Sequence, residues 1–220
     1  MGAVGGADVP PLAPVSAARS EVTCGTTAPP LVRGCPSSTP HSEPGQLRAP
    51  LARSTIATMV SFEPLAIDEA NAFLDESIRE FVSERVPADH ADIAVEKIRE
   101  ELSHRLLPNG ILTSGHRFEA IISNGDGVGR VWFGPLQDDE SDLYICDISI
   151  AAERRREGHA RVVVERILDH ARSSHFARVG LTVTQTNTDA IDLYESLGFV
   201  TTRRDDTDRE MWVVVSPLLT

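Results

Sequence analysis

One short run of charged residues carries the clearest chemical signal in this sequence. The run reads Arg154-Arg155-Arg156-Glu157-Gly158-His159-Ala160. It follows the apolar residues 143–150, which favour a strand, and precedes residues 161–172, whose apolar spacing predicts a helix. A tight turn that opens a helix directs unpaired backbone N–H groups and the positive helix end toward one point. We therefore expect this turn to bind a phosphate group.

The charge of the whole chain makes these arginines more informative. The chain has 33 acidic and 21 basic side chains, with a formal net charge of −12. An acidic chain repels polyphosphates and nucleic acid at long range, so a local cluster of arginines needs a local reason. Arginines in a loop can also serve only for solvation. We expect no nucleic-acid partner, and the acidic surface would tolerate a cationic amine as substrate.

A second pattern follows the helix and a β-rich segment at residues 177–184. Its apolar residues recur at helical spacing, with a glycine where the helix would end in a left-handed conformation. The residues are Asn187, Ala190, Leu193, Tyr194, Leu197, Gly198 and Phe199. The order is therefore strand, phosphate turn, helix, strand, second helix and glycine stop.

Together the two patterns resemble the core signature of the GNAT superfamily of acetyl-CoA-dependent N-acetyltransferases. The first pattern is R-x-x-G-x-A at residues 155–160, and the second is N-x-x-A-x-x-L-Y-x-x-x-G-F at residues 187–199. The resemblance extends over residues 60–215 and implies a mixed α/β fold. That fold is a three-layer αβα sandwich whose mostly antiparallel, mixed sheet splays apart at its centre.

The resemblance also implies where the cosubstrate acetyl-CoA lies. Its pantetheine arm would occupy the gap in the splayed sheet and pair with the backbone of Ile148, Ser149 and Ile150. Its pyrophosphate would meet the turn, and Asn187 would also contact CoA. The turn residues so implied are Arg155, Arg156, Glu157, Gly158, His159, Ala160 and Arg161. The family often has glycine in place of Arg156 and a basic residue in place of Glu157, which leaves open whether CoA binding is weakened.

The chemistry of acetyl transfer sets the expected roles of the remaining residues. An alkylamine has a pKa of about 10 and must lose a proton before it attacks the thioester. The amide of Ile148 or a neighbour would stabilise the oxyanion. The Tyr194 hydroxyl would protonate the leaving thiolate. A tyrosine at this position can also serve only to pack against its neighbours. Three routes stay open for the base, namely Asp147, Glu119 or a water, because a β-bulge can reverse which side chain faces the gap.

The other segments must build the domain around these residues. Their apolar periodicity predicts helices at 68–85 and 90–107, a hairpin of residues 117–123 and 128–134, and strands near Ser61, near Thr201 and at 211–215. The segment Asn124-Gly125-Asp126-Gly127 predicts the turn of that hairpin. The apolar last strand could pair with a second copy of the chain, so a homodimer is one expectation.

Residues 1–58 differ in composition from the rest of the chain. They hold nine of the fourteen prolines and two of the three cysteines, without helical or strand periodicity. We expect a disordered extension followed by an acetyltransferase domain at 59–220, with Met59 as an alternative start. No apolar run approaches the roughly 18 residues of a membrane span. We therefore expect no membrane partner. The scattered cysteines predict a reducing, cytoplasmic setting. No histidines lie at the spacing of metal ligands, so we expect no bound metal.

Three functions fit these observations. The leading expectation is transfer of an acetyl group from acetyl-CoA to a primary amine of a small molecule or peptide, by direct attack on the thioester. The second is a non-catalytic acyl-CoA-binding or sensing module on the same fold. The third is an interaction protein whose proline-containing tail recruits partners. The amine itself is not identified, but we expect loops at 109–115, 137–142 and 203–208 to border its site.

Overall fold

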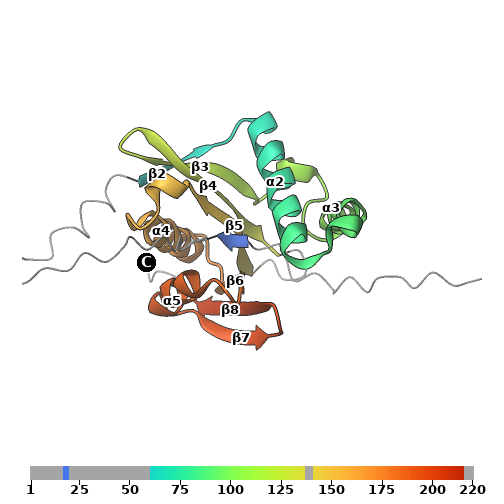
Figure 1. Ribbon diagram of the computed structural model, residues 1–220. Helices are drawn as coiled ribbons and strands as arrows, with labels where there is room; N and C mark the ends of the chain where they lie inside the picture. The colour runs from blue at the N-terminus through green and yellow to red at the C-terminus, as the bar shows by residue number, and fades with distance from the viewer. Residues whose placement is uncertain (1–16, 20–59, 137–140, 216–220) are drawn as a thin grey trace, which may run out of the picture.

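The computed structural model describes residues 17–19, 60–136 and 141–215 (Figure 1). Its strands are β1 (Ala17–Arg19), β2 (Val60–Pro64), β3 (Arg117–Ser123), β4 (Asp126–Pro135), β5 (Asp142–Ile150), β6 (Arg178–Thr184), β7 (Val200–Arg204) and β8 (Asp208–Val214). Its helices are α2 (Ile67–Arg85), α3 (Ala91–Arg105), α4 (His159–Ser173) and α5 (Thr188–Ser196), with 3₁₀ turns η1 (Ala88–His90), η2 (Gly110–Leu112) and η3 (Ala152–Arg154). The element order predicted for the described residues from 60 onward is confirmed.

One mixed sheet forms the centre of the molecule. The strand order is β2-β3-β4-β5-β6-β8-β7, and β1 pairs with β5 outside this path. Along the path every pair is antiparallel except β5 with β6, which is parallel. β5 pairs with β6 only from Asp142 to Ile145, so the two strands separate over the rest of β5. The predicted mixed, centrally splayed sheet is confirmed, and we call this separation the gap.

Helices cover both faces of the sheet, as Figure 1 shows. α2 and α3 bury apolar stripes, including Phe73 and Ile98, against Trp132 on one face. On the other face α4 and α5 bury residues such as Ile167 and Ile191 in a second core. Because an amphipathic helix must bury its apolar stripe against another element, this arrangement gives the expected three layers.

The β3–β4 connection shows how local sequence determines a turn. Asn124 and Gly125 both have positive φ, at +57° and +87°. Ser123 pairs with Asp126, so the loop consists of these two residues alone. A two-residue loop of this kind is a type I′ turn, whose twist matches that of the flanking strands. The hairpin is confirmed, with a tighter turn than the four-residue segment predicted from the sequence.

Two strands differ from the sequence-based expectations. β1 arises within the segment expected to lack regular structure, and it pairs in parallel with β5 from Asp147 to Ser149. Figure 1 shows it as the blue arrow beside β5. β8, the apolar last strand, lies between β6 and β7, so both its edges are paired within one chain. The prediction that it pairs with a second copy is therefore wrong. Met59 and the two cysteines of the N-terminal segment, Cys24 and Cys35, lie outside the described residues.

Candidate functional site

The turn from β5 to α4 has a backbone suited to an anion. Arg156 (φ +64°) and Gly158 (φ +88°) are both left-handed, and Gly158 is the N-cap of α4. Within the described part of the chain, no backbone carbonyl accepts a hydrogen bond from the amides of Arg156, Glu157 or Gly158. The first amides of α4 likewise have no acceptor within the helix. No backbone acceptor thus occupies these N–H groups, which is the arrangement that a phosphate-binding turn requires.

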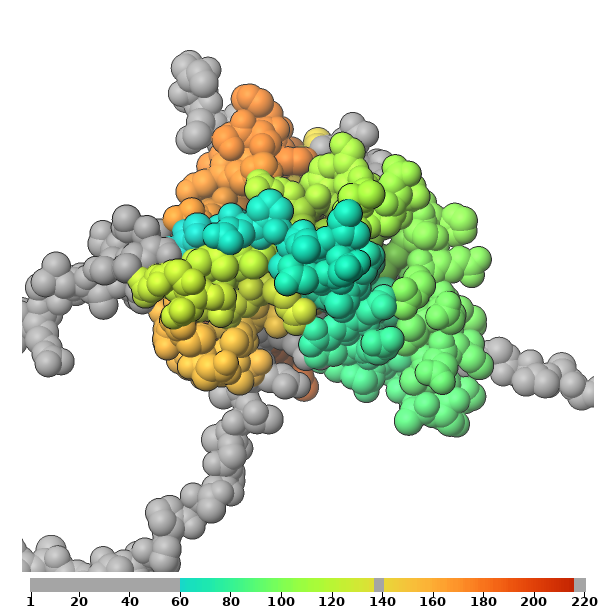
Figure 2. Space-filling view, turned by 90° about the horizontal axis from the view of Figure 1, so that it is seen from above, coloured from blue at the N-terminus to red at the C-terminus, as the bar shows by residue number. Residues whose placement is uncertain are grey.

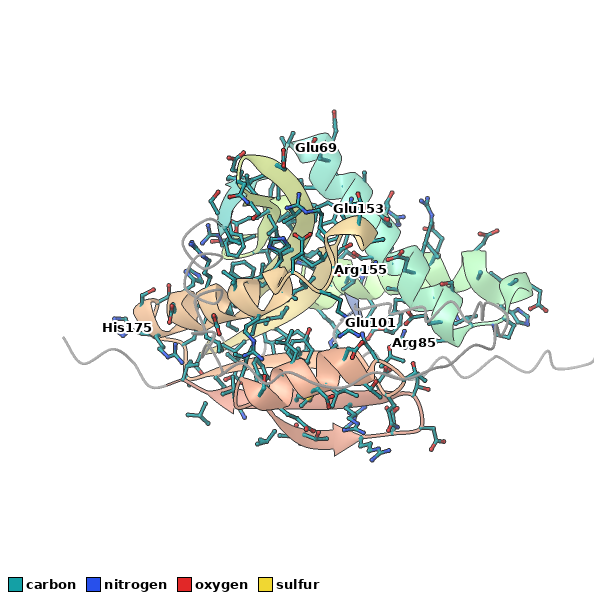
Figure 3. All side chains as sticks on the ribbon, turned by 60° about the vertical axis from the view of Figure 1, so that its left-hand side comes forward. Glu69, Arg85, Glu101, Glu153, Arg155 and His175 are labelled. Carbon is teal, nitrogen blue, oxygen red and sulfur yellow. The ribbon has the colours of Figure 1, made fainter. Side chains whose placement is uncertain are left out.

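A pocket of about 250 Å³ opens at this turn. It is lined by Ile150, Arg154, Arg155, Arg156, Gly158, His159, Ala160 and Arg161, and by Asp189 and Leu193 of α5. The Arg155 Nε atom donates to the Ile150 carbonyl at 3.0 Å, and Arg154 pairs with Asp126 of the hairpin at 3.7 Å. Figure 3 shows Arg155 where β5 passes into α4, and Figure 2 shows this turn beside the β3–β4 hairpin. The structure brings together every turn residue predicted for the pyrophosphate except Glu157.

Glu157 does not line the pocket but interacts within its own turn. Its carboxylate accepts a hydrogen bond from Arg154 Nε at 3.1 Å and lies 2.9 Å from His159 Nε2. The hydrogen bond with His159, followed by the one from Arg154, lowers the pKa of Glu157. Because two donors of the turn already engage this carboxylate, its repulsion of a bound phosphate is reduced. That CoA binding is retained despite Glu157 stays a prediction.

Arg156, where the family often has glycine, affects the backbone of the turn. Its φ of +64° lies in the region that glycine adopts freely and that costs other residues about 1–2 kcal/mol. Its guanidinium pairs with Asp189 of α5 at 2.8 Å, with the arginine side chain 66% exposed. An ion pair so exposed contributes little. Arg156 therefore strains the turn without blocking it.

β5 presents Asp147 to α2. The pairing of β4 with β5 has an irregularity between Trp132 and Phe133, beyond which Asp147 pairs with Trp132, a residue of the α2–α3 core. Asp147 is 1% exposed, and the Ser77 hydroxyl of α2 donates a hydrogen bond to it. The bulge that the sequence could not resolve thus places Asp147 on the α2 side of the gap.

Ser77 is a site residue that sequence reasoning missed. It is 1% exposed and lies within the apolar stripe of α2, next to Ile78. A polar side chain in such a stripe needs a hydrogen-bond partner when it is buried, and this signal was present in the sequence. Its partner is on a strand seventy positions along the chain, which only the folded structure reveals.

Tyr194 lies on α5, in the core that α4 and α5 cover. It is 2% exposed, and its ring lies against Phe199 with centroids 5.6 Å apart. Burial raises the pKa of its phenol, and the negative charge of nearby Asp147 raises it further. The two predicted catalytic residues are therefore electrostatic neighbours, although they come from different elements. A phenol that stays protonated can donate a proton or a hydrogen bond at neutral pH.

Glu119 is not brought to the same place. It pairs with Val131, which belongs to the core under α4, whereas Asp147 pairs with Trp132 on the opposite face. Its carboxylate accepts a hydrogen bond from Arg117, and burial raises its pKa more than Arg117 lowers it. Because β4 lies between β3 and β5, Glu119 is also two strands from the strand that lines the gap.

Asn187 caps α5. Its side-chain oxygen accepts a hydrogen bond from the Ala190 amide at 3.2 Å, which satisfies one of the free donors at the helix start. The capping role that its position predicted is therefore present. A contact between Asn187 and CoA stays a prediction.

The loops expected to border the amine lie at different ends of the sheet. Residues 109–115 lie beside Pro135 and Phe176, at the end where β5 and β6 are still paired. The 203–208 connection lies at the open end, since Asp208 pairs with Thr184 at the last position of β6. Residues 137–140 of the third loop lie outside the described residues. Of the three, only the 203–208 connection is placed near the opening of the gap.

Sites of two other kinds are absent from the described residues. In those residues no group of three His, Cys, Asp or Glu side chains is placed to hold a metal ion. No helix in the described stretches is both long enough and apolar enough to cross a membrane. Cys146 is a free, buried thiol whose pKa is raised by burial.

Comparison with known families and proteins agrees with this geometry. A model of the acetyltransferase (GNAT) family matches residues 76–199. N-acetyltransferase 8 of Rattus norvegicus is 29% identical over 139 residues, which cover 62% of this chain but only 57% of that protein. The uncharacterized N-acetyltransferase YdgE of Bacillus subtilis is 25% identical over 147 residues, which cover 64% of this chain and 92% of that one.

Solved structures share the fold. YycN of Bacillus subtilis, a putative acetyltransferase, superimposes with a TM-score of 0.58 at 22% identity, covering 66% of this chain and 95% of that chain. The spermidine N-acetyltransferase of Vibrio cholerae, solved with CoA and spermine, gives a TM-score of 0.51 at 19% identity, covering 72% of this chain and 96% of that chain. At such identities the likeness concerns the fold alone.

Proposed function

Because this chain belongs to the acetyltransferase (GNAT) family, we propose that it transfers an acetyl group from acetyl-CoA to a primary amine of a small molecule or peptide. The observation that supports the proposal most is the separation of β5 from β6 past Ile145, next to a turn whose amides have no backbone acceptor. The electrostatic influence of Asp147 on Tyr194 supports it further. The fold-level neighbour that was solved with CoA and spermine supports CoA as the cosubstrate and an amine as the acceptor.

The turn residues fit the phosphates of acetyl-CoA. The free amides of residues 156–158 and the start of α4 would accept the pyrophosphate, while Arg155 and Arg161 would offset its charge. Pantetheine carries amide groups, and the backbone of Ile148, Ser149 and Ile150 would pair with them along β5. This arrangement would direct the thioester toward Asp147 and Tyr194.

In the proposed reaction Asp147 takes the proton from the amine, directly or through a water. The amine nitrogen then forms a bond to the acetyl carbon, and the amide of Ile148 or a neighbour stabilises the oxyanion. The carbon–sulfur bond breaks, and the Tyr194 hydroxyl donates a proton to the departing sulfur. The second proton that leaves the nitrogen returns to the Tyr194 oxygen through water, and the proton taken by Asp147 is released to solvent. The Ser77 hydroxyl donates a hydrogen bond to one carboxylate oxygen of Asp147 and would hold this side chain in position. The products are the N-acetylated amine and free CoA.

The same proposal includes the setting and the assembly of the protein. We propose a reducing, cytoplasmic setting because Cys146 is kept as a buried thiol. The net charge of −12 supports an amine substrate and speaks against nucleic acid. If two chains associate through the edges of their sheets next to β8, they would use the edge strand β7 rather than β8.

The direct test is isothermal titration of acetyl-CoA into the full chain and into Gly158→Asp and Gly158→Asn. Both side chains enter the same left-handed position, where an added Cβ would meet no atom within 4 Å, and they differ in charge but hardly in size. We expect Gly158→Asp to bind acetyl-CoA at least about tenfold more weakly than Gly158→Asn. Equal affinities would place the phosphates elsewhere.

The next step is to measure release of free CoA across a panel of primary amines. Amine-dependent release supports the enzyme. Binding of acetyl-CoA without release, for every amine of the panel, would support the sensing module instead.

A further inference from the structure

The chain fills part of its own gap. β1 runs parallel to β5, with Ala17 opposite Asp147, Ala18 opposite Ile148 and Arg19 opposite Ser149. Those β5 positions lie beyond Ile145, where pairing with β6 has ended. In Figure 1 the blue strand lies between the two separated strands. The N-terminal segment therefore lies against the β5 backbone next to Asp147.

The gap offers backbone groups that an extended segment can satisfy. One edge of β5 is paired with β4 along its length, but past Ile145 its other edge has no partner in β6. Unpaired N–H and C=O groups along a strand edge attract another extended chain. A polypeptide strand and the amide groups of pantetheine meet this need in the same way. Only one of them can occupy a given stretch of β5.

We propose that β1 is an autoinhibitory strand, which occupies the acyl-CoA path along β5 and must leave before the cosubstrate binds. The inference rests on the proposed function, since it requires that acyl-CoA use this gap. Its overlap with the expected pantetheine path covers Ile148 and Ser149. The phosphate turn at residues 155–161 is not part of the overlap, so phosphates and β1 do not compete for the same atoms.

The strand is suited to reversible closure. It has three residues, so it makes few hydrogen bonds, and each bond contributes little net free energy. It belongs to the same chain as the gap, joined to β2 by residues 20–59, and this link raises its effective concentration there. If the open state is populated at about 10% or less, the apparent affinity for acetyl-CoA falls about tenfold or more.

The test compares acetyl-CoA binding by three full-length proteins: the unmodified chain, the variant Ala17→Pro/Ala18→Pro, and the control Thr26→Pro/Thr27→Pro. Proline has no N–H to donate to a strand, and the control makes the same change outside β1. We expect the β1 variant to bind acetyl-CoA about tenfold more tightly than the unmodified chain, and the control to match the unmodified chain.

The outcomes separate this inference from the proposed function. Equal affinity of all three proteins, or weaker binding by the β1 variant, overturns autoinhibition while the acyl-CoA site stands. Absence of binding in all three overturns the proposed function and the inference with it.

Hydrogen exchange gives a readout that is independent of affinity. Saturating CoA should speed exchange in the peptide that contains residues 17–19 and slow exchange at residues 156–158. Unchanged or slower exchange at 17–19 would show that β1 and CoA share the gap, which overturns the inference.

Discussion

Asp147 and Tyr194 illustrate how burial determines chemical roles at the scale of single residues. Both are almost completely shielded from water, at 1% and 2% exposure. Burial raises the pKa of the Tyr194 phenol, and the charge of Asp147 acts in the same direction. The phenol is therefore kept protonated, as the role of proton donor in the proposed reaction requires.

Replacing Tyr194 by phenylalanine should remove the proton donor and keep the packing. We expect kcat to fall about a hundredfold while the Kd for acetyl-CoA stays within about twofold. Circular dichroism melting should show a similar Tm, because the ring against Phe199 is kept. An unchanged kcat would mean that another group protonates the sulfur.

Because the pKa of Tyr194 lies above its ordinary value of 10.0, its ionisation should not lower kcat below that pH in the unmodified enzyme.

At the scale of elements, the position of β5 depends on close contact with β4. Gly129 pairs with Ile150, and a Cβ on Gly129 would lie 2.2 Å from the Ser149 carbonyl oxygen. A backbone atom cannot move aside as a flexible side chain can. The strand that lines the gap is therefore fixed in part by the absence of a side chain on its neighbour.

Gly129→Ala should push β5 away from β4 at residues 149 and 150, at the far end of the gap from Ile145. We expect a loss of about 1–3 kcal/mol in the free energy of unfolding, measured by urea titration, and weaker binding of acetyl-CoA. The matched control is Gly127→Ala on the same strand, where an added Cβ meets no atom within 4 Å. If the two variants were equally stable, the close approach would not constrain β5.

His116 directly precedes β3 and is hydrogen-bonded to Trp132 of β4. Its Nδ1 accepts a hydrogen bond from Trp132 Nε1 at 3.2 Å, and burial lowers its pKa from 6.5 to about 4. The unfolded chain therefore takes up a proton at a higher pH than the folded chain does. The contribution of neutral His116 to the free energy of unfolding is therefore fully present above pH 6.5. It is lost as the pH falls toward 4, by at most about 3 kcal/mol.

His116→Asn should remove most of this loss, because asparagine can still accept from Trp132 and does not titrate. The measurement is the free energy of unfolding of the variant and the unmodified chain across that pH range. His175→Asn is the control, since His175 is exposed and its φ of +62° suits asparagine. Parallel pH curves for His116→Asn and the unmodified chain would contradict the prediction.

At the scale of the whole molecule, Arg85 connects the two parts of the sheet that flank the gap. Its side chain is 7% exposed and lies at the end of α2, which packs over the β3–β4–β5 side. It donates to Asp208 of β8 through Nε at 3.2 Å and through a second nitrogen at 2.6 Å. Figure 3 shows Arg85 between α2 and the strands below it. One buried guanidinium thus bridges the opening of the gap.

Arg85→Ala should destabilise the fold by about 3 kcal/mol, because it leaves Asp208 charged and only 16% exposed without this partner. Arg85→Lys should recover only part of the loss, since lysine lacks the forked geometry. The double variant with Asp208→Asn should be more stable than Arg85→Ala alone. Chemical denaturation of these proteins and of Asp208→Asn alone, five in all, measures these differences. Additive effects of Arg85→Ala and Asp208→Asn would show that the pair is not coupled.

Local patterns in the sequence determined most of the elements. Helical periodicity predicted α2 to α5, and Asn124-Gly125 predicted the hairpin turn, because neighbours in the chain decide these features. The phosphate turn was also readable, since a glycine before a helix start is a local arrangement. Tyr194 could be named from the family resemblance, and Asp147 only as one of three candidates for the base, because it lies on the predicted strand. No local rule brings the two residues together.

Only the tertiary structure decided which side chains meet. The irregular pairing of β4 with β5 set the face of Asp147, and its Ser77 partner comes from a distant helix. Whether β8 is an edge strand depends on where β7 packs, and the place of β1 depends on a gap between two other strands. These contacts join residues far apart in the chain. Their free energies depend on burial and geometry that exist only after folding, whereas turns and helix periodicity are properties of adjacent residues.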